Sequence, residues 1–127
     1  MVPVNELTAS QARKAMVRGD ITAETLLRSC LDRIAARDDV VKAWCHLAAE
    51  TALVVAKELD RGSRIGESGS LAGLPVGVKD IIDTVDMPTT YGSAVYPDHR
   101  PSMDAACEQL AVMKNDFGMK FAVKFFQ

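Results

Sequence analysis

The residue in this sequence best suited to chemistry is a lysine at the end of a short apolar segment. Lys79 follows residues 74–78 and is followed directly by Asp80. An amine acts as a base near neutral pH only when burial or neighbouring groups lower its pKa from about 10.4 toward about 7 to 8. The end of a buried strand would supply such burial. Most of the chain's 15 lysines and arginines are nevertheless expected to be solvated, so this position needs further support.

Two other interpretations of the same segment fail on residue spacing. A phosphate-binding P-loop ends in Gly-Lys-Ser/Thr, whereas here Lys79 is followed by Asp80. A Ser-x-x-Lys nucleophile needs a serine three residues before the lysine, where this chain has Val76. The sequence therefore predicts neither nucleotide binding nor a serine nucleophile next to Lys79.

The histidines and cysteines do not form a metal site in the sequence. His46 and His99 are isolated and lack nearby acidic partners, so we expect structural or surface roles for both, with no metal and no cofactor. Cys30, Cys45 and Cys107 are widely spaced, which predicts neither a disulfide framework nor a zinc site. We expect Cys107 to pack against the core, and the cysteine usage is typical of a reducing cytoplasm.

Helix signals dominate the first half of the chain. Thr8 and Gln11 have the spacing of a capping box, and the helix they open should run to about Arg18, with Gly19 as its C-terminal cap. Thr22 can cap a second helix, whose apolar residues recur at helical spacing on one face. Both helices are therefore expected to bury one side and expose the other.

The rest of the chain alternates between short ordered segments and loops. We expect, in order, an extended segment at 40–47, a helix at 48–60, a glycine- and serine-rich loop at 61–73, a strand at 74–79, a long structured loop at 80–101 and a last helix from Met103 to about Met113 capped by Ser102. This order predicts an α/β protein with few strands.

The segment around Lys79 resembles the amidase signature family. Residues 71–80 read Leu-Ala-Gly-Leu-Pro-Val-Gly-Val-Lys-Asp, and residues 88–93 read Pro-Thr-Thr-Tyr-Gly-Ser. In that family a similar segment bears the catalytic lysine, and a Thr-x-Gly-Ser-like loop follows it. Weaker matches upstream extend the resemblance over residues 6–109. It implies the N-terminal helices and one or two strands of a mixed-sheet α/β fold, present incompletely.

The resemblance also implies a reaction. In the family the lysine belongs to a Ser–Ser–Lys triad that hydrolyses carboxamide C–N bonds through an acyl-enzyme. Lys79 would be the base of such a triad. The resemblance places both serines beyond residue 127, so we expect this chain to carry only the lysine and to be inactive alone.

Polar residues after Lys79 are candidates for contact with a substrate. By resemblance, Thr90, Gly92 and Ser93 would line a substrate entrance; a turn whose hydroxyls bond its own backbone explains them nearly as well. Asp80 and Asp83 either hydrogen-bond the adjacent loop or are exposed acids. The sequence leaves both pairs of alternatives open.

The end of the chain departs from the family's pattern. We divide the sequence into residues 1–110, the N-terminal part of an amidase signature domain, and residues 111–127, a divergent tail holding all 4 phenylalanines. One hypothesis is a truncated product of a shifted reading frame. The alternative is a short amphipathic segment, because Phe117, Phe121 and Phe125 would share a helical face. Helices without their usual sheet would favour self-association.

Composition narrows the classes of partner. The chain has 127 residues, 48% hydrophobic and 25% charged, with a net charge of −2 and a pI near 5.6. These values predict a globular protein that binds a small molecule or a protein rather than nucleic acid or a membrane. The resemblance implies that the small molecule is an amide, and the cysteine usage predicts a cytoplasmic location. Two further hypotheses are a non-enzymatic α/β module that binds a protein and one component of an aminoacyl-tRNA amidotransferase.

Overall fold

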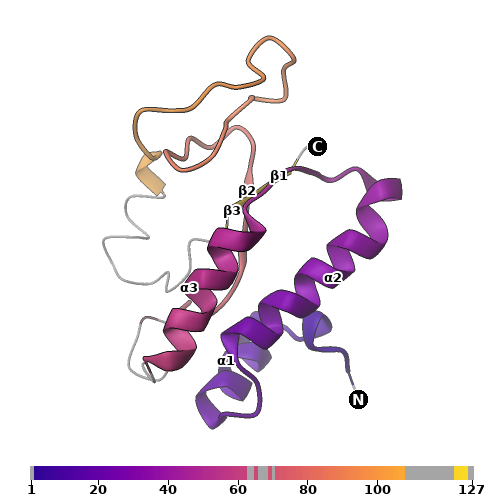
Figure 1. Ribbon diagram of the computed structural model, residues 1–127, viewed down its shortest axis with the longest axis vertical. Coiled ribbons are helices and arrows are strands. Elements are labelled where there is room, and N and C mark those ends of the chain that lie inside the picture. The colour runs from indigo at the N-terminus through magenta and orange to yellow at the C-terminus, as the bar shows by residue number, and fades with distance from the viewer. Residues whose placement is uncertain (1, 63–64, 66–68, 70, 108–121, 126–127) are drawn as a thin grey trace.

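The computed structural model describes residues 2–62, 65, 69, 71–107 and 122–125. Its elements, in chain order, are the 3-10 helix η1 (Val4–Glu6), α1 (Ala9–Arg18), α2 (Ala23–Val41), β1 (Trp44–Leu47), α3 (Ala49–Arg61), β2 (Val76–Lys79) and β3 (Ala122–Phe125). Helices α2 and α3 lie side by side, and α1 lies at the end of the molecule away from the loop that follows β2 (Figure 1). No helix among the described residues is long and apolar enough to cross a membrane.

Local sequence signals set the ends of the first two helices. The Thr8 hydroxyl accepts the Gln11 N–H at 3.3 Å, and the Gln11 side chain accepts the Thr8 N–H at 2.9 Å. Gly19 ends α1 with a φ of 78°, a left-handed conformation that glycine adopts without steric cost. Thr22 caps α2 by accepting the Thr25 N–H at 3.0 Å. The predicted capping box and both caps are confirmed.

A second cap on α2 comes from a different helix. The carboxylate of Asp60, in the last turn of α3, accepts the backbone N–H groups of Ala23 and Glu24 at 2.8 and 3.0 Å. Negative charge is stabilising at a helix N-terminus, where N–H groups lack intrahelical partners. One carboxylate therefore satisfies two of these donors and ties the end of α3 to the start of α2.

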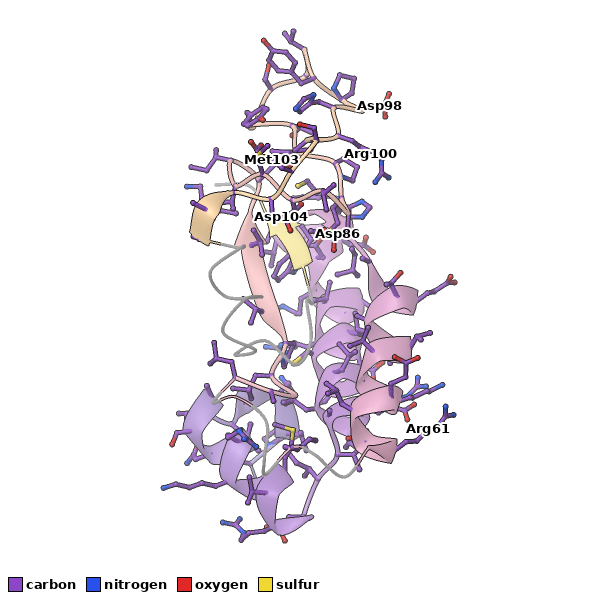
Figure 2. All side chains as sticks on the ribbon, turned by 90° about the vertical axis from the view of Figure 1, so that its left-hand side faces the viewer. Arg61, Asp86, Asp98, Arg100, Met103 and Asp104 are labelled. Atoms are coloured by element: carbon purple, nitrogen blue, oxygen red, sulfur yellow. The ribbon has the colours of Figure 1, made fainter. Side chains whose placement is uncertain are left out.

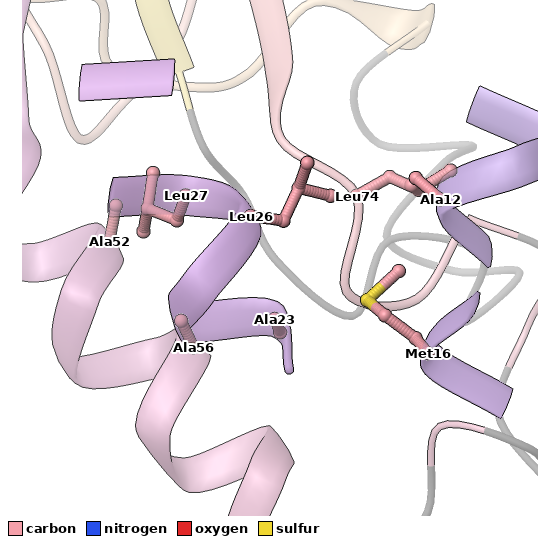
Figure 3. Packing of buried hydrophobic residues seen from close by; sticks show 8 residues of the cluster. All are labelled: Ala12, Met16, Ala23, Leu26, Leu27, Ala52, Ala56 and Leu74. Atoms are coloured by element: carbon pink, nitrogen blue, oxygen red, sulfur yellow. The ribbon is translucent and has the colours of Figure 1, made fainter. Parts of the chain in front are cut away.

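Small residues allow α2 and α3 to approach closely. Ala52 and Ala56 of α3 are fully or almost fully buried beside Leu27 of α2, which is completely buried (Figure 3). The other members of this core cluster are Ala12, Met16, Ala23, Leu26 and Leu74. Burial of a leucine side chain contributes about 1.5–3 kcal/mol. The cluster thus joins three helices to the segment that leads into β2.

The sheet is completed by a strand from the far end of the chain. Its order is β1-β3-β2, with β3 antiparallel to β1 and parallel to β2. Lys79 and Trp44 both pair in register with Phe125. The helical face proposed for the tail is therefore wrong at Phe125, while Phe117 and Phe121 lie outside the described residues. Pairing with two strands holds this segment extended.

The expected extended segment at 40–47 is also partly wrong. Val40 and Val41 belong to α2, and only Trp44–Leu47 forms a strand. The helix continues because its end is capped further along: the Asp38 carboxylate accepts the Ala43 N–H at 2.7 Å, beside a left-handed residue that ends the helix. At the end of α2 the N–H groups of Lys42 and Ala43 both donate to Asp38, one to its carbonyl and one to its carboxylate. An extended segment at 40–43 would not make these bonds.

The last predicted helix begins later than expected. Residues 102–105 are not helical, helical structure begins at 106, and residues 108–113 lie outside the described part of the chain. Asp104 accepts the Val85 N–H at 2.8 Å, and the Ala105 N–H donates to the Asp83 carbonyl at 2.9 Å. These groups bond the preceding loop, which replaces the expected first turn. The predicted loop at 61–73 is described at 61, 62, 65, 69 and 71–73 only.

We predict that Asp60→Ala destabilises the protein by about 1–2 kcal/mol, because two N–H groups at the start of α2 lose their acceptor. Urea unfolding measures this change. Glu58→Ala is the matched control: Glu58 is exposed on the same turn of α3, and the described N–H bonds from the start of α2 to α3 go to Asp60, so we expect a change within about 0.5 kcal/mol. Equal losses in the two variants would show that Asp60 does not act as a cap.

Candidate active site

Strand β2 places Lys79 at its C-terminal end. Val78 is buried and packs in one cluster with Met87, which lies in the loop that follows. Successive residues of a strand point to opposite faces, so Lys79 extends from the face opposite Val78. Gly77 is exposed and Lys79 is half-buried. The predicted strand is confirmed over Val76–Lys79.

The amine of Lys79 has no partner within the described structure. Among the residues that the structure describes, the ammonium group forms no hydrogen bond or ion pair. Its backbone carbonyl accepts the Ile82 N–H at 2.9 Å, which turns the chain away from the strand immediately after the lysine. The amine is therefore held at a strand end without being committed to a carboxylate.

Asp80 binds the loop that carries the predicted substrate residues. Its side chain is buried, with an exposed fraction of 2%. One carboxylate oxygen accepts the Thr90 N–H at 2.9 Å; the other accepts the Thr90 hydroxyl and, at 3.1 Å, the Gly92 N–H. Its backbone carbonyl accepts the Tyr91 N–H at 3.3 Å. Of the two interpretations of Asp80, hydrogen bonding to the adjacent loop is confirmed.

The structure brings Thr90 and Gly92 to the end of β2, and Ser93 closes the turn that begins at Thr90. The Ser93 N–H donates to the Thr90 carbonyl at 2.9 Å, and the Ser93 hydroxyl accepts the Val95 N–H at 3.2 Å. The Thr90 hydroxyl donates to Asp80. Both hydroxyls therefore have protein partners, as a turn that bonds itself would require. A role in substrate contact stays a prediction for all three residues.

An aromatic cluster that the sequence did not predict surrounds this turn. The Tyr91 hydroxyl donates to the Asp83 carboxylate at 2.5 Å and lies 3.4 Å from Nε2 of His99. The Tyr91 and Tyr96 rings meet edge to face, with centroids 6.1 Å apart. The hydrogen bond to Asp83 and the negative charges of Asp83 and Asp80 raise the pKa of Tyr91 above 10.0. The sequence did not predict this cluster because its residues lie in a loop, where spacing does not follow the period of a helix or a strand.

The loop after β2 forms one end of the molecule. Asp86, Asp98, Arg100, Met103 and Asp104 all lie at this end, away from α1 (Figure 2). Because the loop folds back on itself, the Thr89 N–H donates to the His99 carbonyl at 2.9 Å. The expected long structured loop is confirmed, and hydrogen bonds hold it to the end of β2.

A separate cleft of about 220 Å³ lies near the other end of β2, and Lys79 is not among the residues that line it. Its walls include Cys30, Trp44 and Gly77. Burial raises the pKa of the Cys30 thiol, which keeps it protonated and a poor nucleophile at neutral pH. Cys107 is exposed, so its predicted packing was wrong. The described residues contain no group of three or more potential metal ligands.

Comparison with known proteins identifies the family. The sequence model of the Amidase family matches residues 25–114. A glutamyl-tRNA(Gln) amidotransferase subunit of Chloroflexus aurantiacus is 39% identical over 106 residues, which cover 83% of this chain and 22% of that protein. The native peptide amidase of Stenotrophomonas maltophilia aligns with a TM-score of 0.77 and 30% identity over 98% of this chain and 25% of its own. An amidase family protein of Bacillus anthracis aligns with a TM-score of 0.81 and 25% identity, over 96% of this chain and 24% of its own.

The chain belongs to the amidase family. The relatives that it matches include amidases and amidotransferase subunits. It spans about a fifth to a quarter of the length of the relatives it matches. The matched region contains β2, Lys79 and the whole loop from Asp80 to Ser93. The predicted family and the predicted α/β fold, with part of its sheet, are confirmed.

We predict that Asp83→Asn lowers the pKa of Tyr91 toward 10.0, because the main cause of the rise is its hydrogen bond to that carboxylate. With the pKa raised in the folded state, the bond's contribution to stability is present below about pH 10 and is lost as pH rises through the raised value. Ultraviolet titration of tyrosinate, with Tyr91→Phe to assign the signal, measures it. Asp86→Asn is the control and should leave the titration unchanged; an unaltered curve in Asp83→Asn would contradict the assignment.

Proposed function

We propose that Lys79 is the general base of an amide-hydrolysing site. The observation that carries this proposal is the state of Lys79: a half-buried residue at the end of β2, inside the region matched to the Amidase family, whose amine has no hydrogen-bond or ion-pair partner among the described residues. A lysine committed to a carboxylate is held in its charged form, whereas a base must give up its proton. The packing of Val78 in β2 against Met87 in the following loop fixes the backbone position from which the Lys79 side chain extends.

The proposed reaction uses two serines that the family resemblance places outside these 127 residues. The neutral amine of Lys79 takes a proton from a bridging serine, which takes one from the nucleophilic serine. The nucleophile attacks the amide carbonyl; the C–N bond breaks, and the nitrogen leaves with a proton returned along the same path. Water then releases the acyl group as a carboxylic acid. We therefore propose that the 127-residue polypeptide is inactive alone.

The loop after β2 could hold the residues that contact the substrate at this site. Asp80 holds the turn at residues 90–92 against the chain just after Lys79. Catalysis gains from fixed groups because a misplacement of about 1 Å costs roughly 100-fold in rate. We propose that Thr90, Gly92 and Ser93 form one rim of the entrance for a small-molecule amide, with their backbone held in place by these bonds.

A second candidate function is transfer of an amide group to aminoacyl-tRNA, as part of an amidotransferase. The observation that favours it is the 39% identity to a glutamyl-tRNA(Gln) amidotransferase subunit. The net charge of −2 gives no electrostatic reason for these 127 residues to bind RNA by themselves, so tRNA binding would come from other parts of such an enzyme. Hydrolysis of a simple amide without any partner protein would favour the first candidate.

A segment exchange tests the role of Lys79. Residues 2–107 of this chain replace the structurally aligned segment of the S. maltophilia peptide amidase, and amide hydrolysis is measured as product release. We predict that Lys79→Met lowers kcat about 10⁴-fold or more, because the nucleophile loses its base. Circular dichroism verifies that each protein is folded.

The matched control for this exchange is Lys14→Met. Lys14 is a lysine on α1, at the end of the molecule away from the loop that follows β2 (Figure 1), and its replacement should leave kcat within about twofold. If the folded Lys79→Met protein kept more than about a tenth of the activity, Lys79 would not be the base.

A further inference from the structure

Three successive backbone N–H groups are directed at one residue. The N–H groups of Thr90 and Gly92 donate to the Asp80 carboxylate at 2.9 and 3.1 Å, and the Tyr91 N–H donates to the Asp80 carbonyl at 3.3 Å. Tyr91 and Gly92 both have positive φ, 55° and 71°. Successive N–H groups in such a turn form a concave site for anions. Here the anion is part of the chain.

We propose that Asp80 is a positioning residue whose carboxylate occupies a backbone anion nest formed by residues 90–92. The nest fixes this turn to the residue that follows Lys79. The catalytic consequence rests on the proposed function of Lys79, whereas the nest itself rests only on the observed bonds.

The chemistry of the site demands a carboxylate. An ionised Asp80 accepts at both oxygens, and its donors include two N–H groups and the Thr90 hydroxyl. An asparagine of the same shape would replace one acceptor by an NH₂ group that faces a donor. The side chain is 2% exposed, so water cannot supply the missing bonds, and a charged Asp80 requires the turn to stay in place.

Tyr91 shows that the turn is held against a local preference. A non-glycine residue with φ of 55° is uncommon and persists only when surrounding contacts determine it. The contacts are on both sides: its N–H bonds Asp80, and its hydroxyl bonds Asp83. Without the carboxylate, the N–H groups of Thr90 and Gly92 would lose their acceptor, and the turn would relax to a conformation that suits tyrosine.

Chemical rescue tests the nest in the 127-residue chain. In Asp80→Ala, the amide NMR signals of Thr90 and Gly92 should move to the positions of unstructured residues, and added formate should return them toward wild-type positions. Chloride at the same ionic strength should not. Asp98→Ala, in the same loop and exposed, is the control and should leave both signals unchanged. Unmoved signals in a folded Asp80→Ala, or no response to formate, would overturn the nest.

A second variant covers the case in which Asp80→Ala does not fold. Asp80→Asn keeps the shape and one acceptor, so we expect one of the two amide signals to move and formate to have no effect, because the cavity stays filled. Wild-type positions for both signals in Asp80→Asn would also overturn the proposal.

The positioning role is measured in the exchanged peptide amidase. We expect Asp80→Ala to lower kcat about 100-fold, to raise KM because the rim at residues 90–92 moves, and to keep the same pH profile; formate should restore at least about a tenth of the lost rate. A purely structural role would lower the amount of folded enzyme and leave kcat per folded molecule unchanged. If Lys79→Met keeps full activity while formate restores the NMR signals, the function of Lys79 fails and the nest stands. If Lys79→Met loses activity while formate fails to restore the NMR signals, Lys79 stands as the base and the nest is rejected.

Discussion

A buried carboxylate must be surrounded by donors, because its charge is costly wherever water is excluded. Asp80 meets this requirement with groups ten to twelve residues further along the chain. The loop from residues 80 to 93 therefore closes on the residue at which it starts. Its conformation is set by this closure rather than by any helix or strand. The position of Lys79 relative to the loop follows from the same bonds.

Carboxylates on one element bonding backbone N–H groups of another recur through this fold. Asp60 caps α2 from α3, Asp38 bonds the chain that leads into β1, and Asp104 bonds Val85 across the long loop. Each aspartate satisfies donors that secondary structure leaves open. The apolar cluster between α1, α2 and α3 supplies most of the burial. The aspartates determine how the segments between these elements are arranged.

Much of the fold was predictable because its signals are local. The capping box at Thr8, the glycine after α1, the Thr22 cap and the strand before Asp80 are each read from a few neighbouring residues. The central strand was not predicted, because its partners β1 and β2 lie far away in sequence. The same holds for the Asp60 cap, whereas the Tyr91 cluster was missed because its residues lie in one loop without periodic spacing.

The candidate site follows the same division. Lys79 was recognisable from its segment, since the residues before and after it carry the family resemblance. The choice between a loop-bound and an exposed Asp80 needed the fold, because both suit an acid after a strand. The late start of the last helix has a similar origin: Asp104 looks like a helix-start residue locally, but its carboxylate bonds Val85. Long-range hydrogen bonds decide what short patterns leave open.

The central claim is that the end of β2 is arranged before any substrate binds, through the bonds between Asp80 and residues 90–92. Amide hydrogen exchange in the unmodified chain tests it most directly. We predict that the Thr90 and Gly92 amides exchange at least about tenfold more slowly than the exposed Asp98 amide of the same loop, since each donates to a buried charge. Equal exchange rates for the three amides would contradict the account.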